Sequence, residues 1–204
     1  TYCKHDLPNY DVFDEQRYFT PDNRPFVFEA KGTLFGVNIC EDTWFHYAPE
    51  CAQAAGAQVL LVLNASPFHL GKQAQRLQTM RANVSHFGLP LVYANLTGGQ
   101  DELVFDGASF VLAADGALVA MAPYFDEAVL VVEFVDSVPQ PASIVTEPSL
   151  EALAYQALVL GVRDYVGKNG FPGALIGLSG GVDSALTLAI AVDALGADRV
   201  RAVM

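Results

Sequence analysis

Apolar runs separated by turns alternate along the chain between residues 33 and 134. They are rich in Val, Ile, Leu and Phe and are four to eight residues long, which is typical of β-strands. Strands are predicted over Thr33–Cys40, Gln58–Asn64, Leu89–Asn95, Ser109–Ala113, Leu118–Met121 and Ala128–Phe134. Because some runs alternate with polar residues and others do not, we expect an α/β fold in which the sheet packs against helices on one face and a second sheet on the other.

The segment Lys72–Phe87 has helical periodicity instead. Its side chains recur at three- and four-residue spacing, which is typical of one face of a helix. That face consists of Leu77, Met80, Arg81 and Val84. Gly88 and Pro90 follow directly and end the helix.

The pattern changes after residue 135. Residues 136–148 hold three prolines among small and polar residues, which predicts an extended linker. Ser149 then serves as the N-cap of a long helix. Its predicted apolar face consists of Leu150, Leu153, Ala154, Ala157, Leu158, Gly161, Val162 and Tyr165.

After a break at Gly170–Gly173, the chain continues as a strand (Ala174–Leu178), a helix that ends at Leu195 and a second strand (Val200–Met204). This order is the beginning of a doubly wound parallel domain. We therefore predict a domain over 1–135, a linker over 136–148 and the start of a second domain over 149–204.

Length and composition narrow the class of protein. The 204 residues correspond to about one and a third domains. With 52% hydrophobic and 17% charged residues, the chain is globular rather than disordered. Its net charge of −12 argues against nucleic acid or an anionic membrane as a partner. Three cysteines, an odd number, favour a reducing, cytoplasmic setting. Because the chain begins at Thr1 and stops within an apolar run, we expect it to be an internal part of a longer protein.

The loop between the strand ending at Leu178 and the next helix has the composition of an anion site. Two glycines let the backbone approach a ligand, and the free N–H groups of a helix N-terminus favour phosphate. Asp183 could hold Mg²⁺ against phosphate oxygens. The loop lacks the Gly-Lys-Ser/Thr ending of a Walker A motif. An ordinary glycine-rich turn with a Ser/Asp cap is the alternative interpretation.

Cys40 lies at the C-terminal end of a predicted strand, where α/β proteins collect their sites. The backbone N–H of Glu41 could stabilise an oxyanion there. Lys4 offers a cation that could lower the pKa of a thiol. A structural role in the core remains open for Cys40, because cysteine is among the most buried residue types.

Two resemblances join these features. The loop Gly177–Ser184 resembles the pyrophosphate loop of the ATP-pyrophosphatase (PP-loop) synthetases. The segments Lys4–Phe19, Asn38–Trp44 and Asn64–Lys72 resemble the nitrilase, or carbon–nitrogen hydrolase, superfamily. Their combination is similar to the family of glutamine-dependent NAD⁺ synthetases over essentially the whole chain. The fold implied is a nitrilase-like αββα sandwich without its N-terminal part, followed by the first strand, helix and strand of a Rossmann-like PP-loop domain.

The resemblance implies a role for each candidate residue in the first part. Cys40 matches the nucleophile that attacks the glutamine side-chain amide, and Lys4 matches the lysine that steadies the oxyanion with the N–H of Glu41. Glu15 matches an auxiliary carboxylate that orients the lysine. The residues expected to bind glutamine are Tyr10, Ser66 and Lys72. The family's general base, a glutamate, lies upstream of the lysine, so we expect the 204 residues alone to have negligible activity.

For the second part, the resemblance implies ATP and Mg²⁺. The ATP-binding residues would be Gly177, Leu178, Ser179, Gly180, Gly181, Val182, Asp183 and Ser184, with Asp183 on the metal. The reaction implied is adenylation of deamido-NAD⁺ and its amidation to NAD⁺, a carbon–nitrogen ligase activity with glutamine as the nitrogen donor. We expect small-molecule partners and a homo-oligomer. A nitrilase-type amidase fused to a different PP-loop ligase, or an inactive nitrilase-fold scaffold, are the alternatives.

Overall fold

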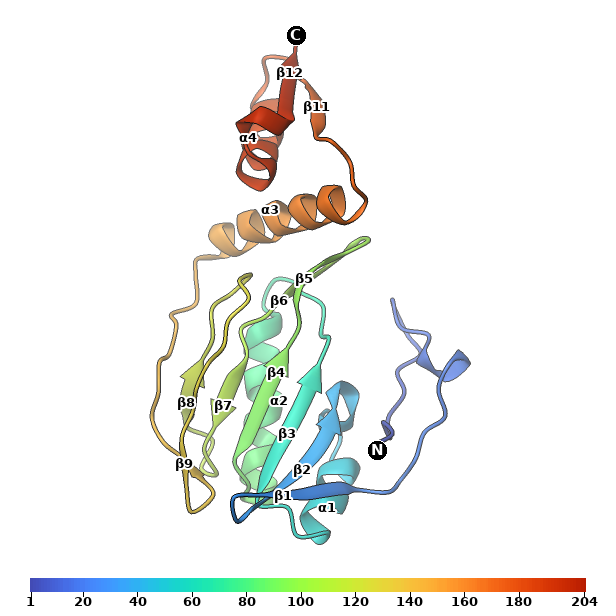
Figure 1. The fold of residues 1–204 in the computed structure, drawn as a ribbon, viewed down its shortest axis with the longest axis vertical. Coiled ribbons are helices and arrows are strands. Elements are labelled where there is room, and N and C mark those ends of the chain that lie inside the picture. Colours follow the sequence, from blue (N-terminus) through green and yellow to red (C-terminus); the bar gives the residue numbers. More distant parts are fainter.

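A six-stranded mixed sheet with the order β1-β2-β3-β4-β7-β8 forms the centre of the computed structural model, which describes residues 1–204 (Figure 1). The strands are β1 (Phe26–Ala30), β2 (Thr33–Ile39), β3 (Val59–Asn64), β4 (Leu91–Asn95), β7 (Phe110–Leu112) and β8 (Leu118–Met121). The inner strands β2, β3 and β4 are parallel, and the pairs at both flanks are antiparallel. The C-terminal ends of three strands therefore meet at one edge.

Helices α1 (Tyr47–Ala54) and α2 (Lys72–Phe87) connect the parallel strands and pack against the sheet (Figure 1). The main core of 17 buried residues joins these helices and the sheet, and it also includes Leu153, Ala157 and Leu160 from the helix that follows the predicted linker. Within it, the rings of Tyr93 and Phe110 stack with their centroids 4.7 Å apart. The predicted bounds of α2 are confirmed, and five of the six strands predicted before residue 135 agree with the structure to within two residues at each end.

The four residues at helical spacing on α2 do not all face the core. Arg81 is exposed and donates a hydrogen bond to the Gly116 carbonyl, whereas Arg76 is fully buried. The buried stripe of α2 also contains Gln73 and Asn83. Apolar periodicity could not reveal this stripe, because the helix buries polar groups that find their partners in loops distant along the chain.

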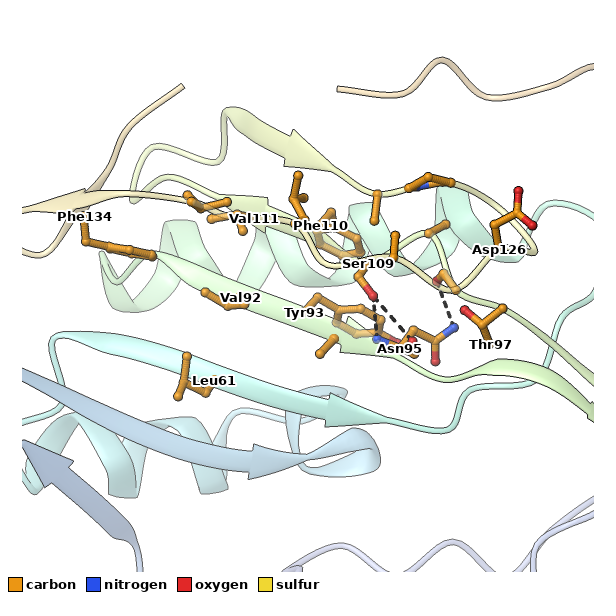
Figure 2. A pocket seen from close by; sticks show the side chains of 18 residues that line it. Leu61, Val92, Tyr93, Asn95, Thr97, Ser109, Phe110, Val111, Asp126 and Phe134 are labelled. Carbon is orange, nitrogen blue, oxygen red and sulfur yellow. Dashed lines mark hydrogen bonds between the residues drawn. The ribbon is translucent and has the colours of Figure 1, made fainter. Parts of the chain in front are cut away.

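The opposite face of the sheet is not covered by a second sheet within these residues. Side chains including Leu61, Val92 and Phe134 line a cavity of about 410 Å³ on this side (Figure 2). The strand predicted over Ala128–Phe134 is wrong. Leu130 and Val132 pack against a small buried cluster, yet only Phe134–Val135 (β9) pairs, with Val138–Pro139 (β10). The alternating apolar side chains of this segment pack against the cluster, but its backbone has no neighbouring strand with which to form a ladder.

The predicted linker is partly tied to the sheet. The Ala142 N–H donates to the Val119 carbonyl at 3.1 Å, and Val145 donates to Met121 at 3.2 Å. The backbone after β10 therefore runs beside β8 before the next helix begins. The domain boundaries themselves stay a prediction.

A hairpin that the sequence patterns did not indicate, β5 (Thr97–Gln100) and β6 (Leu103–Asp106), extends from the sheet edge toward helix α3 (Leu150–Lys168) (Figure 1). The Asp164 carboxylate accepts a hydrogen bond from the Gly99 N–H at 2.7 Å, and Lys168 donates to the Gly99 carbonyl. The Ser149 N-cap is confirmed, because its hydroxyl accepts from the Ala152 N–H at 3.3 Å. Of the predicted α3 face, only Leu153 and Ala157 are buried, together with Leu160.

The last elements are β11 (Ala174–Gly177), α4 (Val182–Leu195), the short 3₁₀ turn η3 (Ala197–Arg199) and β12 (Val200–Val203). Two other 3₁₀ turns lie earlier in the chain, η1 at Glu15–Arg17 and η2 at Cys40–Thr43. Strands β11 and β12 are parallel, which confirms the predicted strand–loop–helix–strand unit. None of the helices has the length and apolar character required to span a bilayer.

The contact between α3 and the hairpin gives a test of packing. A Cβ at Gly99 would lie 3.1 Å from Asp164 Cβ and 3.3 Å from Gly161 Cα. Gly99→Ala should therefore destabilise this contact by about 1–3 kcal/mol. Urea denaturation and the rate of proteolytic cleavage within residues 136–148 measure the effect.

Gly167→Ala is the matched control, since a Cβ there meets nothing within 4 Å. It should leave stability unchanged or raise it by about 0.5–1 kcal/mol. Equal effects of both variants would contradict the packing argument.

Candidate active site

Cys40 follows the last residue of β2 and begins η2. Its φ of +47° lies in the left-handed region, which is costly for a residue with a side chain and is found where a turn fixes that side chain's direction. Cys40 lines two cavities at once. One has a volume of about 570 Å³ and the other of about 220 Å³. A thiol in this position can meet a ligand on one side and its activating groups on the other.

Lys4 and Glu15 line the larger cavity together with Cys40. The Lys4 Nζ donates to both carboxylate oxygens of Glu15, at 2.7 and 2.9 Å. The Lys4 side chain is only 10% exposed, so the ion pair is shielded from solvent. The structure thus brings Cys40 together with two residues, Lys4 and Glu15, that the sequence placed in a different segment.

Burial raises the pKa of the Cys40 thiol above its usual value. The Lys4 ammonium acts in the opposite direction, and the carboxylates of Glu41 and Glu15 add to the rise. The net result is a thiol that stays protonated at neutral pH. Such a thiol needs a base before it can act as a nucleophile.

The smaller cavity contains the three residues predicted to bind glutamine: Tyr10, Ser66 and Lys72. The Tyr10 hydroxyl donates to the Glu41 carboxylate at 2.7 Å. The Lys72 Nζ lies 4.4 Å from the centre of the Trp44 ring, and partial burial lowers the pKa of this lysine. A carboxylate group of a ligand could pair with the Lys72 ammonium, and an ammonium group could pair with the Glu41 carboxylate. The cavity therefore offers both charges that an α-amino acid requires.

Arg76 forms the wall behind Ser66, a role that sequence patterns missed. Its guanidinium donates to the Ser66 hydroxyl at 3.2 Å and to the Ser66 carbonyl at 2.8 Å. It also forms an ion pair of 2.8 Å with Asp106, and both side chains are almost completely buried. Removing one partner of such a pair typically costs about 3–5 kcal/mol. The pair fixes the loop after β3 to the base of the β5–β6 hairpin.

Asp42 is a second residue whose place the sequence did not explain. Its carboxylate is fully buried and accepts four hydrogen bonds. The donors are the Tyr2 hydroxyl and the backbone N–H groups of His5, Asp6 and Ile39. The charged residues after Cys40 thus divide their roles: Glu41 faces the cavity and Asp42 faces the interior.

The predicted phosphate loop lies between β11 and α4, at the other end of the chain. Gly181 is the N-cap of α4, and Gly180 has a φ of +83°. A Cβ at Gly177 or Gly180 would meet nothing within 4 Å, so the backbone is open to a ligand. The Ser184 hydroxyl accepts from the Ser179 N–H at 3.2 Å and donates to the Gly181 carbonyl at 3.0 Å. These bonds shape the loop.

Asp183 lies in the first turn of α4. The structure contains no group of three or more His, Cys, Asp or Glu side chains that could hold a metal ion. One carboxylate beside open backbone N–H groups suits Mg²⁺ only where phosphate oxygens and water complete the coordination.

The charges around Cys40 give a pH-dependent prediction. Alkylation of Cys40 by iodoacetamide should rise with pH, with a midpoint above about 8.5, the value of an unperturbed thiol. Lys4→Gln should move the midpoint upward because it removes the cation that favours the thiolate. Glu15→Gln should move it downward, because it removes an anion and frees the charge of Lys4. Peptide mass mapping separates Cys40 from Cys3 and Cys51. Shifts in the same direction for both variants would contradict this account.

Two family models match the chain. The carbon-nitrogen hydrolase family matches residues 1–140, and the NAD synthase family matches residues 154–204. The glutamine-dependent NAD(+) synthetase of Acinetobacter baylyi is 48% identical over all of this chain, and that of Aquifex aeolicus is 39% identical over 99% of it. The chain spans 38% and 42% of the lengths of these relatives.

Solved structures agree with these matches. Glutamine-dependent NAD+ synthetase from Acinetobacter baumannii in complex with adenosine diphosphate superimposes with a TM-score of 0.94 at 47% identity, over 98% of this chain and 39% of that one. An amidase of the nitrilase superfamily from Nesterenkonia AN1 covers 60% of this chain and 45% of its own, with a TM-score of 0.53 and 28% identity. The chain therefore belongs to the carbon-nitrogen hydrolase family, and its final segment is similar to NAD synthases.

Proposed function

We propose that the protein carrying this chain is a glutamine-dependent NAD⁺ synthetase and that residues 1–135 belong to its glutaminase domain. The supporting observation is Cys40, which lies between the Lys4–Glu15 pair on one side and the cavity with Tyr10, Ser66 and Lys72 on the other. The names of the relatives add to this support.

In the proposed reaction, the Cys40 sulfur attacks the side-chain amide carbon of glutamine. The Lys4 ammonium and the Glu41 N–H stabilise the negative oxygen of the tetrahedral intermediate. Collapse of this intermediate breaks the carbon–nitrogen bond, releases ammonia and leaves a thioester, which water then hydrolyses to glutamate. Glu15 holds Lys4 in position, and the base that takes the thiol proton would return it to the leaving nitrogen as the carbon–nitrogen bond breaks.

Residues 149–204 would begin the second domain, after the linker over 136–148. The Gly177–Ser184 loop would hold the phosphates of ATP on its open backbone N–H groups at the N-terminus of α4. The Asp183 carboxylate would hold Mg²⁺, which when bound neutralises charge on those phosphates. The carboxylate of deamido-NAD⁺ would attack the α-phosphate of ATP there and release pyrophosphate, and ammonia would then displace AMP to form the amide. We further propose a cytoplasmic homo-oligomer that acts on small molecules.

Separating the two nitrogen sources tests this function in the full-length protein. Cys40→Ala should lower glutamine-dependent NAD⁺ formation roughly a thousandfold and retain formation from ammonium ions, since only the glutaminase step needs the thiol. Asp183→Asn should lower both. NAD⁺ is measured from deamido-NAD⁺ and ATP with either nitrogen source.

Cys51→Ala is the matched control, because Cys51 lies in α1 away from both cavities described above, and it should retain both activities. Glutamine-dependent activity that survives Cys40→Ala would exclude Cys40 as the nucleophile. A parent protein that hydrolyses glutamine without forming NAD⁺ would indicate a ligase with a different acceptor.

A further inference from the structure

The buried carboxylate of Asp42 connects the two segments that carry Cys40 and Lys4. Its Oδ2 accepts from the Ile39 N–H at 2.9 Å and from the Tyr2 hydroxyl at 2.7 Å. Its Oδ1 accepts from the N–H groups of His5 and Asp6, both at 2.9 Å. Ile39 directly precedes Cys40, and His5 directly follows Lys4. One side chain therefore determines how two catalytic candidates lie relative to each other.

The position selects a carboxylate over an amide. A carboxylate has about four lone-pair sites, which equals the number of donors that point at Asp42. An asparagine offers one acceptor oxygen, so its NH₂ group would face donors and leave buried N–H groups without partners. Burial and the hydrogen bond to Asp42 both raise the pKa of Tyr2, so its hydroxyl stays protonated and keeps donating.

Besides Asp42, the tethered segment meets the surroundings of the nucleophile through single side-chain contacts: the Tyr10 hydroxyl donates to Glu41 at 2.7 Å, and the His5 ring lies 4.5 Å from the Tyr47 ring. Residues 1–14 contain no regular helix or strand before η1. Besides the Lys4–Glu15 pair, the Lys4 carbonyl accepts a long hydrogen bond of 3.4 Å from the Asp22 N–H. An irregular segment that must hold a lysine beside a thiol depends on such side-chain tethers, since no ladder or helix fixes its backbone.

We propose that Asp42 is a positioning residue for the Cys40–Lys4 pair. It is fully buried and lines neither cavity beside Cys40, and it acts by fixing the end of β2 and the Lys4 segment to the same carboxylate. This role rests on the proposed function for its effect on turnover. Its effect on the thiol can be measured independently of any turnover.

The test is Asp42→Asn in the full-length protein, with Cys40 alkylation followed against pH. Loss of the tether should weaken the influence of Lys4 and move the alkylation midpoint upward by about half a pH unit or more. Glutamine-dependent kcat should fall roughly tenfold or more with a small change in KM, because a misplaced lysine affects the transition state more than binding. NAD⁺ formation from ammonium ions should remain.

Val84→Ala is the control for a loss of stability alone. Val84 is buried in the main core on α2, away from the cavities around Cys40, so this variant should be less stable yet keep the parent's alkylation midpoint. Tyr2→Phe removes one of the four donors and should shift the midpoint in the same direction as Asp42→Asn, by a smaller amount. The alkylation midpoint of Tyr2→Phe tests the proposal even if Asp42→Asn fails to fold.

The proposal is overturned if Tyr2→Phe and any folded Asp42→Asn protein keep or lower the parent's midpoint, or if Val84→Ala raises it equally. The failure of the proposed function has a different signature. In that case the parent protein has no glutamine-dependent activity, while the order of alkylation midpoints among the variants remains.

Discussion

Parallel pairing of β2, β3 and β4 is the constraint on which the rest of the structure depends. Parallel strands end at the same edge of a sheet, so Cys40 after β2 and Ser66 after β3 come together although 25 residues separate them. The same pairing requires crossover connections, and α1 and α2 meet that requirement while covering one face of the sheet. The smaller cavity beside Cys40 forms where these strand ends meet the segment that carries Tyr10.

The site is held by charged groups that a core designed only for stability would avoid. Arg76 and Asp106 form a buried pair, and Asp42 is a buried carboxylate surrounded by donors. Burying such groups carries a large desolvation cost that hydrogen bonds only offset. In return, each group fixes an irregular segment: Arg76 holds the loop at Ser66, and Asp42 holds the segment around Lys4. Rigid positioning of loops around a nucleophile is the physical reason for retaining these groups.

The β5–β6 hairpin joins the two regions matched by different family models. Near its tip, Gly99 contacts α3. At its base, Asp106 pairs with Arg76, which in turn binds Ser66 in the smaller cavity beside Cys40. Because both contacts use one short hairpin, the surroundings of Cys40 and the start of the second region are parts of one continuous set of contacts. Close approach at Gly99 is possible because this position has no side chain.

The sequence by itself determined the local elements whose signals lie within a few residues: the bounds of α2, the Ser149 cap, and the unit from β11 through α4 to β12. Motif resemblance also named Cys40, Lys4, Glu15 and the Gly177–Ser184 loop, whose proposed roles stay predictions. Only the tertiary structure decided which side chains are buried and which contacts form between residues distant in the sequence. It buried Arg76 rather than Arg81, left residues 128–133 without a ladder partner and placed four donors around Asp42. Hydrophobic periodicity reports burial of apolar groups, whereas a buried charge is tolerated only because partners far along the chain surround it, and those partners exist only once the chain has folded.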